Sequence, residues 1–139
     1  MKPELIKAYY ETTKIFASLS KAVRLKVGAI IVKDDKIISI GYNGTPIGWD
    51  NNCEDVLEDG TLKTKPEVIH AEQNCIAKLA KSNESGDNAT LFCNFAPCLD
   101  CSKLIAISGI KKVYFGEAYR SNDGIEFLEK CGVDVEKIA

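Results

Sequence analysis

The chain has 139 residues, of which 45% are hydrophobic and 27% charged, as in ordinary soluble globular domains. Its 18 basic and 20 acidic residues give a net charge of −2, which excludes the strong basic surplus typical of proteins that bind nucleic-acid polymers. No apolar run approaches the roughly 20 residues of a membrane span, and the N-terminus lacks a signal-peptide core. We therefore expect one cytoplasmic domain over residues 1–139, without a membrane partner.

The first half of the chain predicts a helix, a hairpin and a long loop. Near-helical spacing over residues 4–19 indicates an amphipathic helix with an apolar face of Leu5, Ala8, Tyr9, Phe16 and Leu19. The β-rich runs at 27–32 and 36–41, separated by three polar residues, predict a strand–turn–strand hairpin. Residues 42–67 make a connection far longer than the usual roughly 2–6 residues, so we expect a binding loop there.

The second half of the chain alternates helices with strands. Helical patterns cover residues 70–81, 98–108 and 122–131. Strand patterns cover residues 90–95, 111–117 and 133–138, the last of which fits a helical tail equally well. Right-handed crossovers make the later strands parallel. The order predicts an α/β fold, a three-layer α/β/α sandwich around a five-stranded mixed sheet.

Three residues in the second half suggest a metal site. His70 is the chain's only histidine, and Cys98 and Cys101 lie one turn apart at a predicted helix start, where the helix dipole favours thiolates. A CxxC pair alone fits metal binding, redox chemistry or two small core residues. With His70 there are three ligands, and three protein ligands with an open fourth position are typical of catalytic zinc. Cys53, in the long loop, is a weaker candidate for a fourth ligand.

The spacing of Glu72 gives it a possible role beside that site. It follows His70 by two residues in the first helical turn, where its carboxylate can face a metal-bound water without binding the metal. Such a carboxylate can take the water's proton and pass it to the substrate. A first-turn glutamate can also simply suit the helix dipole. The other cysteines, Cys75, Cys93 and Cys131, fall on apolar faces and are expected in the core.

The motif His70-Ala71-Glu72, followed by Pro97-Cys98-Leu99-Asp100-Cys101, resembles the H-x-E…P-C-x-x-C signature of zinc nucleobase deaminases. The segments KVGAIIV, SIGYNGTPIG, VIHAEQNCI and APCLDCSKLIAISGIKKVYFGEAY extend the resemblance over residues 15–135. Together they resemble deoxycytidylate (dCMP) deaminases, and GYNGTPxG is the most discriminating piece. Many free-nucleoside cytidine deaminases carry cysteine in place of the motif's histidine, which argues against that branch.

The resemblance implies a cytidine deaminase-like fold and a role for each matching residue. His70, Cys98 and Cys101 would bind one Zn²⁺, and Glu72 would be the proton shuttle. The remaining roles concern the nucleotide: a contact to deoxyribose or base from Asn43, to phosphate from Arg24, and packing beside it by Ala71 and Tyr119. Asn43 also suits a plain turn, Arg24 a solvated basic face, and Tyr119 an ordinary strand end.

The implied reaction is hydrolytic deamination of dCMP to dUMP, a nucleotide-pool step that feeds thymidylate synthesis. Family members are commonly homo-oligomers, and several respond to dCTP and dTTP through the segment that here includes Gly41, Tyr42, Gly44 and Thr45. A triphosphate would bring Mg²⁺, and dCTP could be a substrate as well as an effector. A second, structural zinc is not expected, because the loop offers one cysteine and no histidine.

Two other functions fit parts of the sequence. A tRNA adenosine deaminase would share the zinc motif, but the charge balance and GYNGTP speak against it. A non-catalytic module that binds zinc or nucleotides would keep the ligands without needing Glu72. Turnover, or its absence, distinguishes the second alternative from an enzyme.

Overall fold

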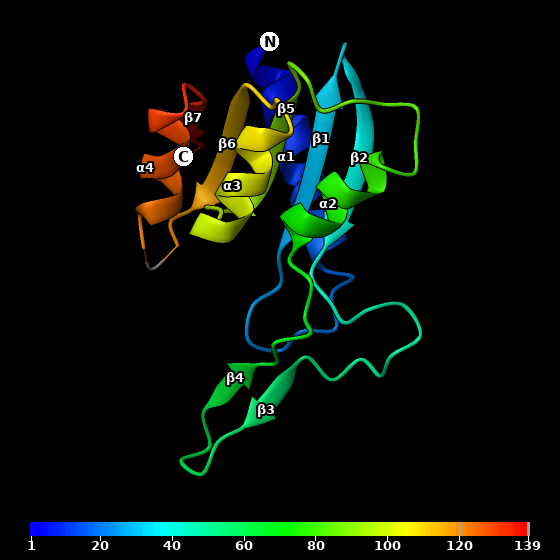
Figure 1. The fold of residues 1–139 in the computed structure, drawn as a ribbon, viewed down its shortest axis with the longest axis vertical. Helices are drawn as coiled ribbons and strands as arrows, with labels where there is room; N and C mark the ends of the chain where they lie inside the picture. The colour runs from blue at the N-terminus through cyan, green and yellow to red at the C-terminus, as the bar shows by residue number, and fades with distance from the viewer. Residues whose placement is uncertain (120, 139) are drawn as a thin grey trace.

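The computed structural model describes residues 1–119 and 121–138 and is built on a five-stranded sheet (Figure 1). The strands are β1 (Gly28–Lys33), β2 (Lys36–Tyr42), β5 (Thr90–Phe95), β6 (Lys112–Glu117) and β7 (Asp134–Lys137). Their order is β2-β1-β5-β6-β7. β1 is antiparallel to both its neighbours, whereas β5, β6 and β7 are parallel. The predicted five-stranded mixed sheet is confirmed, with 133–138 as a strand.

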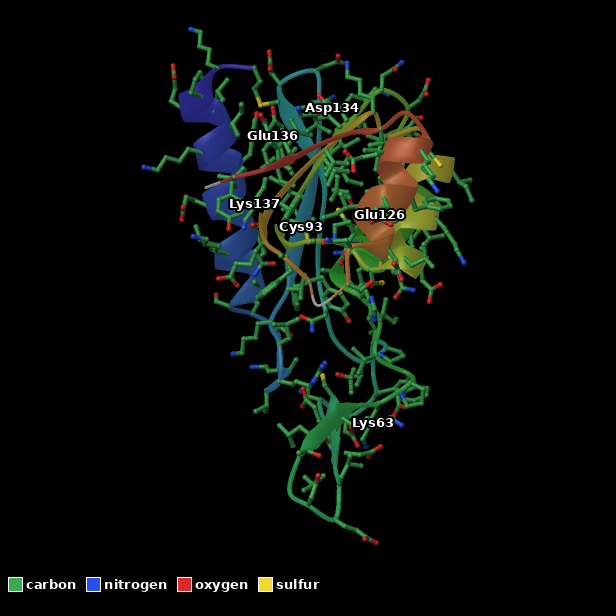
Figure 2. All side chains as sticks on the ribbon, turned by 90° about the vertical axis from the view of Figure 1, so that its left-hand side faces the viewer. Lys63, Cys93, Glu126, Asp134, Glu136 and Lys137 are labelled. Carbon is green, nitrogen blue, oxygen red and sulfur yellow. The ribbon has the colours of Figure 1, made fainter. Side chains whose placement is uncertain are left out.

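Helices cover both faces of the sheet. They are α1 (Pro3–Ala17), α2 (Ala71–Leu79), α3 (Leu99–Ile107) and α4 (Asp123–Lys130). Figure 2 shows α1 and α4 on opposite sides of the sheet, with Cys93 between them. The three-layer α/β/α sandwich is therefore confirmed. Within the described residues, no helix combines the length and apolarity needed to cross a membrane.

Alternating side chains of the central strands form two cores. Ala29 and Ile31 of β1 belong to the core shared with α2, α3 and α4, whereas Ile30 and Val32 point to α1. All four are at most 2% exposed. A strand buried on both faces reads as a continuous apolar run, which explains the sequence of β1.

The apolar face predicted for α1 is correct only in part: Tyr9 packs against the core, whereas Leu5, Ala8 and Leu19 are exposed. The buried positions are Tyr10, Thr13 and Ala17, while Leu5 is 37% and Leu19 50% exposed. Thr13 can be buried because its hydroxyl donates to the Tyr10 carbonyl at 2.6 Å, which satisfies its polar group within the helix. A hydrophobicity pattern counts threonine as polar and so shifts the face.

The remaining cysteines only partly match their predicted burial. Cys75 and Cys93 lie in the core, as expected. Cys131 is exposed, since α4 ends at Lys130 and the chain turns away there through Gly132. The prediction of a core position for Cys131 is therefore wrong.

The segment expected to be a loop, 42–67, contains a second, two-stranded sheet. β3 (Glu54–Val56) pairs antiparallel with β4 (Leu62–Thr64), and the hairpin extends beyond the main sheet at the bottom of Figure 1. Its turn is closed by Asp59, whose carboxylate accepts from the Thr61 amide at 3.0 Å and the Thr61 hydroxyl at 2.6 Å. The dipeptide Asp59-Gly60 is a hairpin signal that could have revealed the strands.

Gly41 of β2 brings the sheet close to the start of α2. A Cβ there would lie 2.5 Å from the Ala71 carbonyl oxygen and 2.7 Å from the Cys75 nitrogen. We expect Gly41→Ala to lower the free energy of unfolding by about 1–3 kcal/mol, because backbone on both sides must shift. Urea denaturation measures this.

Gly44→Ala is the matched control, since a Cβ at Gly44 meets nothing within 4 Å. Its unfolding free energy should stay within about 0.5 kcal/mol of the wild type. Equal stability of the two variants would contradict the close approach of β2 to α2.

Candidate metal centre and nucleotide pocket

His70 stands at the entrance of α2, one residue before the helix begins. Its backbone N–H donates to Gln73 Oε1 at 2.7 Å, and its carbonyl accepts from the Asn74 amide at 3.0 Å. These bonds fix the residue at the helix N-terminus. Its ring Nδ1 lies 3.3 Å from Cys101 Sγ and 3.6 Å from Cys98 Sγ. The fold thus joins the starts of α2 and α3 through these three side chains.

The geometry of this group fits a zinc ion. The three ligand atoms all lie within 4.8 Å of one another. A tetrahedral zinc, with Zn–N of about 2.0–2.1 Å and Zn–S of about 2.3 Å, separates nitrogen and sulfur ligands by roughly 3.6 Å. The observed 3.6 Å to Cys98 Sγ equals that value, and the 3.3 Å to Cys101 Sγ is slightly shorter. Within residues 1–119 and 121–138 this is the one group of three or more candidate ligands, and Cys53 lies outside it.

The surroundings of the two thiols favour metal binding. A hydrogen bond with the Cys101 thiol, and then one with His70, lower the pKa of Cys98 to about 4. The same hydrogen bond raises the pKa of the Cys101 thiol, and burial raises it further. The metal-free pair therefore holds a thiolate beside a thiol. Zinc binding must release the remaining proton, since the thiolate is the ligand form.

Glu72 lies in the first turn of α2 and is only 4% exposed. Burial, the largest cause, raises the pKa of its carboxyl to about 7. A carboxyl with a pKa near neutrality can both accept and return a proton under physiological conditions. The environment of Glu72 therefore suits general acid–base chemistry.

One pocket is lined by Glu72 together with His70 and Cys98 of the metal group. Among its lining residues are all four predicted nucleotide contacts: Arg24, Asn43, Ala71 and Tyr119. The sequence did not predict several other lining residues, among them Glu54, Thr64 and Phe95. Glu54 and Thr64 come from the unpredicted hairpin.

Asn43 is already engaged with the protein backbone. Its Oδ1 accepts from the Val27 amide at 2.9 Å, and its Nδ2 donates to the Leu25 carbonyl at 2.8 Å. A primary amide has a second hydrogen and further lone pairs, so a nucleotide contact remains available to it. Its role at the nucleotide stays a prediction, and its structural role is to hold the segment that carries Arg24.

The predicted effector segment lies mostly apart from this pocket. Tyr42, Gly44 and Thr45 line a separate surface hollow with Trp49, and Asn43 contributes to both hollows. Gly41 packs against α2 instead. Most of the predicted effector segment thus lies outside the pocket that Glu72 lines, and its function stays a prediction.

A family model for the cytidine and deoxycytidylate deaminase zinc-binding region matches residues 4–117. The chain belongs to this family. As a member it is a zinc-dependent hydrolytic deaminase, and the resemblance seen in the sequence is confirmed.

Individual deaminases agree with this assignment. The crystal structure of dCMP deaminase from cyanophage S-TIM5 in complex with dCMP and dUMP is 52% identical, with a TM-score of 0.93 and 99% of each chain covered. The deoxycytidylate deaminase of phage T4 is 34% identical over 84% of this chain and 80% of its own. That of Saccharomyces cerevisiae is 31% identical over the whole of this chain but only 46% of its own. The chain thus spans less than half the length of the yeast relative.

Proposed function

We propose that residues 1–139 form a single deaminase domain that converts dCMP and water to dUMP and ammonia. The observation that carries this proposal is one pocket lined by His70, Cys98, the buried Glu72 and Arg24, with Cys101 completing the metal group behind its wall. The similar cyanophage protein, whose crystal structure contains dCMP and dUMP, supports the choice of substrate.

In this proposal His70 Nδ1 and the thiolates of Cys98 and Cys101 hold one zinc ion. When bound, zinc supplies hydroxide near neutral pH by lowering the pKa of a coordinated water to about 7. Glu72 takes a proton from the water as the water oxygen bonds to C4 of cytosine, and it delivers that proton to N3. Glu72 then passes the remaining proton of the hydroxyl on C4 to the 4-amino nitrogen. The C4–N4 bond breaks, ammonia leaves, and a carbonyl remains at C4.

Arg24 is the proposed phosphate contact. A guanidinium presents paired donors that match phosphate oxygens, and that of Arg24 makes one long bond, 3.4 Å from Nη1 to Thr64 Oγ1. We expect Arg24→Ala to raise KM for dCMP about 10–100-fold with little change in kcat, because a charge-assisted contact worth about 1.5–3 kcal/mol is lost. Deoxycytidine turnover should be unaffected.

Lys21→Ala is the control for net charge. Lys21 belongs to the same basic stretch but lines the separate hollow with Tyr42. A rise in KM for dCMP with Lys21→Ala equal to that with Arg24→Ala would mean that general surface charge, and not the guanidinium, attracts the phosphate.

The other pocket residues have proposed roles in placing the nucleoside. Ala71, a fully buried residue of the pocket wall, would offer only small bulk and backbone groups beside the base. Tyr119 supplies an aromatic ring at the pocket wall, and Asn43 the remaining capacity of its amide. These three would orient C4 toward Glu72.

The regulatory and cellular parts of the proposal rest on the family alone. The hollow of Tyr42, Gly44 and Thr45 is the candidate site for dCTP or dTTP, with Mg²⁺ accompanying the triphosphate. A homo-oligomer acting in the cytoplasm is the expected state. Acceptance of dCTP as a substrate belongs to the same proposal.

Ammonia release from dCMP, dCTP, deoxycytidine and cytidine, measured side by side with zinc-loaded protein, tests the function. Preferred turnover of dCMP is the expected result. Equal turnover of dCTP would show that the pocket tolerates a triphosphate and would argue against a separate effector role. No turnover of any substrate, with dCTP and Mg²⁺ also supplied, would contradict the proposed activity.

A further inference from the structure

The segment 23–28, which carries Arg24 and leads into β1, is held by three side chains from elsewhere in the chain. Glu54 comes from β3, Asn43 directly follows β2, and Asn94 comes from β5. Each of them binds two backbone groups of the segment. In Figure 1 this segment descends from the sheet toward the β3–β4 hairpin.

Of these three side chains, Glu54 is the one that binds the backbone of Arg24 itself. The amides of Val23 and Arg24 both donate to Glu54 Oε2 at 3.0 Å. Glu54 is only 7% exposed, and burying a carboxylate is costly unless hydrogen bonds satisfy it. Two amide donors on one carboxylate oxygen make a charge-assisted anchor at the backbone of Arg24 itself.

The two asparagines hold the rest of the segment in the same way. Asn43 binds the Leu25 carbonyl and the Val27 amide, as described above. Asn94 Oδ1 accepts from the Gly28 amide at 2.9 Å, and its Nδ2 donates to the Lys26 carbonyl at 3.1 Å. Carboxamide pairs of this kind replace the backbone partners that an irregular segment lacks.

The hairpin also contacts the Arg24 side chain. Thr64 of β4 lies opposite Glu54 in the β3–β4 pairing, and its hydroxyl is the partner of Arg24 Nη1. One cross-strand pair, Glu54 and Thr64, therefore meets both the backbone and the guanidinium of Arg24. Both members also line the catalytic pocket.

We propose that Glu54 is a positioning residue that fixes Arg24 at the pocket and so sets the preference for a phosphorylated over an unphosphorylated nucleoside. This inference rests on the proposed function, in which Arg24 meets the phosphate. Glu54 acts through the conformation of residues 23 and 24, and Asn43 and Asn94 hold the segment on the side of β1. Ordering the arginine before binding reduces the entropic cost of the contact.

The test compares Glu54→Leu, which removes the acceptor, with Glu54→Gln, which keeps one oxygen for the two amides. Glu54→Leu should raise KM for dCMP at least about tenfold, with kcat changed less than about threefold and kcat/KM for deoxycytidine unchanged. Glu54→Gln should stay within about threefold of wild type. Glu58→Gln, at an exposed position of the same hairpin, is the matched charge control and should equal wild type.

A double-mutant cycle decides whether Glu54 works through Arg24. In an Arg24→Ala background, Glu54→Leu should cause no further rise in KM for dCMP. An undiminished effect there, or an equal loss with deoxycytidine, would overturn the positioning role. So would wild-type kinetics of Glu54→Leu, or a Glu54→Gln variant as impaired as Glu54→Leu.

Amide hydrogen exchange tests the anchor without any variant. The Val23 and Arg24 amides of the wild-type protein should exchange slowly although both residues are exposed, and fast exchange would overturn the inference. If wild type shows no preference for dCMP over deoxycytidine, both the phosphate role of Arg24 and the selectivity role of Glu54 fall. Slow exchange in that case would still support the anchored conformation of residues 23 and 24, but not its role in selectivity. Loss of the proposed function is thereby distinguished from loss of the anchor.

Discussion

Replacing Glu72 with glutamine should lower kcat for dCMP by at least about 10⁴-fold while the protein stays folded and zinc-loaded. Glutamine keeps the size of the side chain but cannot carry the proton from water to N3 and on to the leaving amine. General acid–base transfer of one proton is worth about 10²–10⁴-fold, and Glu72 serves more than one transfer. Single-turnover ammonia release, with zinc content measured on the same sample, gives the result.

The free energy of unfolding of this variant is the control that shows whether it stays folded. Burial raises the pKa of Glu72 to about 7 from 4.5, so the folded metal-free protein binds more protons than the unfolded chain between these values. Its stability therefore falls as pH rises through that window. Because glutamine does not ionise, metal-free Glu72→Gln should be at least as stable as wild type at pH 8. Activity above one-hundredth of wild type would contradict the shuttle role.

Replacing Cys101 with serine should remove both zinc and activity. Cys101 is fully buried and supplies one of the three ligand atoms, and an alcohol is a far poorer zinc ligand than a thiolate. Even loss of a group that only orients a zinc ligand costs about 10–100-fold in affinity, so loss of the ligand should cost more. Elemental analysis after dialysis should show the wild type holding about one zinc per chain and the variant almost none.

Cys75→Ser is the matched control for that experiment. Cys75 is a fully buried thiol on the core side of α2, outside the group of candidate ligands. It should lose stability, because a hydroxyl replaces a sulfur in an apolar site, yet keep its zinc. Loss of zinc from Cys75→Ser but not from Cys101→Ser would contradict the proposed ligand set.

The sequence predicts the layered fold well because the central strands are buried on both faces. Their apolar runs are long and bounded by turn-formers, so the position and type of β1, β5 and β6 follow from local pattern. The β3–β4 hairpin was not predicted because its strands are short and mostly exposed, with no apolar alternation. Only its Asp59-Gly60 turn carries a local signal.

The metal group could be predicted for a different reason. The chain has a single histidine and a single CxxC pair, and each lies at the start of a predicted helix, so order and spacing suffice to bring them into one hypothesis. The structure places His70, Cys98 and Cys101 within reach of one ion. The pKa of Glu72 could not be foreseen, because it depends on burial by residues distant in sequence.

The contacts around the proposed phosphate site are the part of the pocket that the sequence predicted least well. Glu54 looks like an ordinary surface acid until the structure places its carboxylate against two amides some 30 residues away. Asn43 was expected to serve the nucleotide, and its amide is found bound to the backbone of Leu25 and Val27. Such contacts depend on chain segments meeting in space, which no local pattern encodes.

A crystal structure of zinc-loaded Glu72→Gln with dCMP tests the central claim most directly, because the inactive variant should retain its substrate. The account predicts zinc between His70, Cys98 and Cys101, cytosine C4 beside residue 72, and the phosphate within hydrogen-bond distance of Arg24. Zinc held by other residues, or dCMP bound only in the hollow of Tyr42 and Trp49, would contradict it.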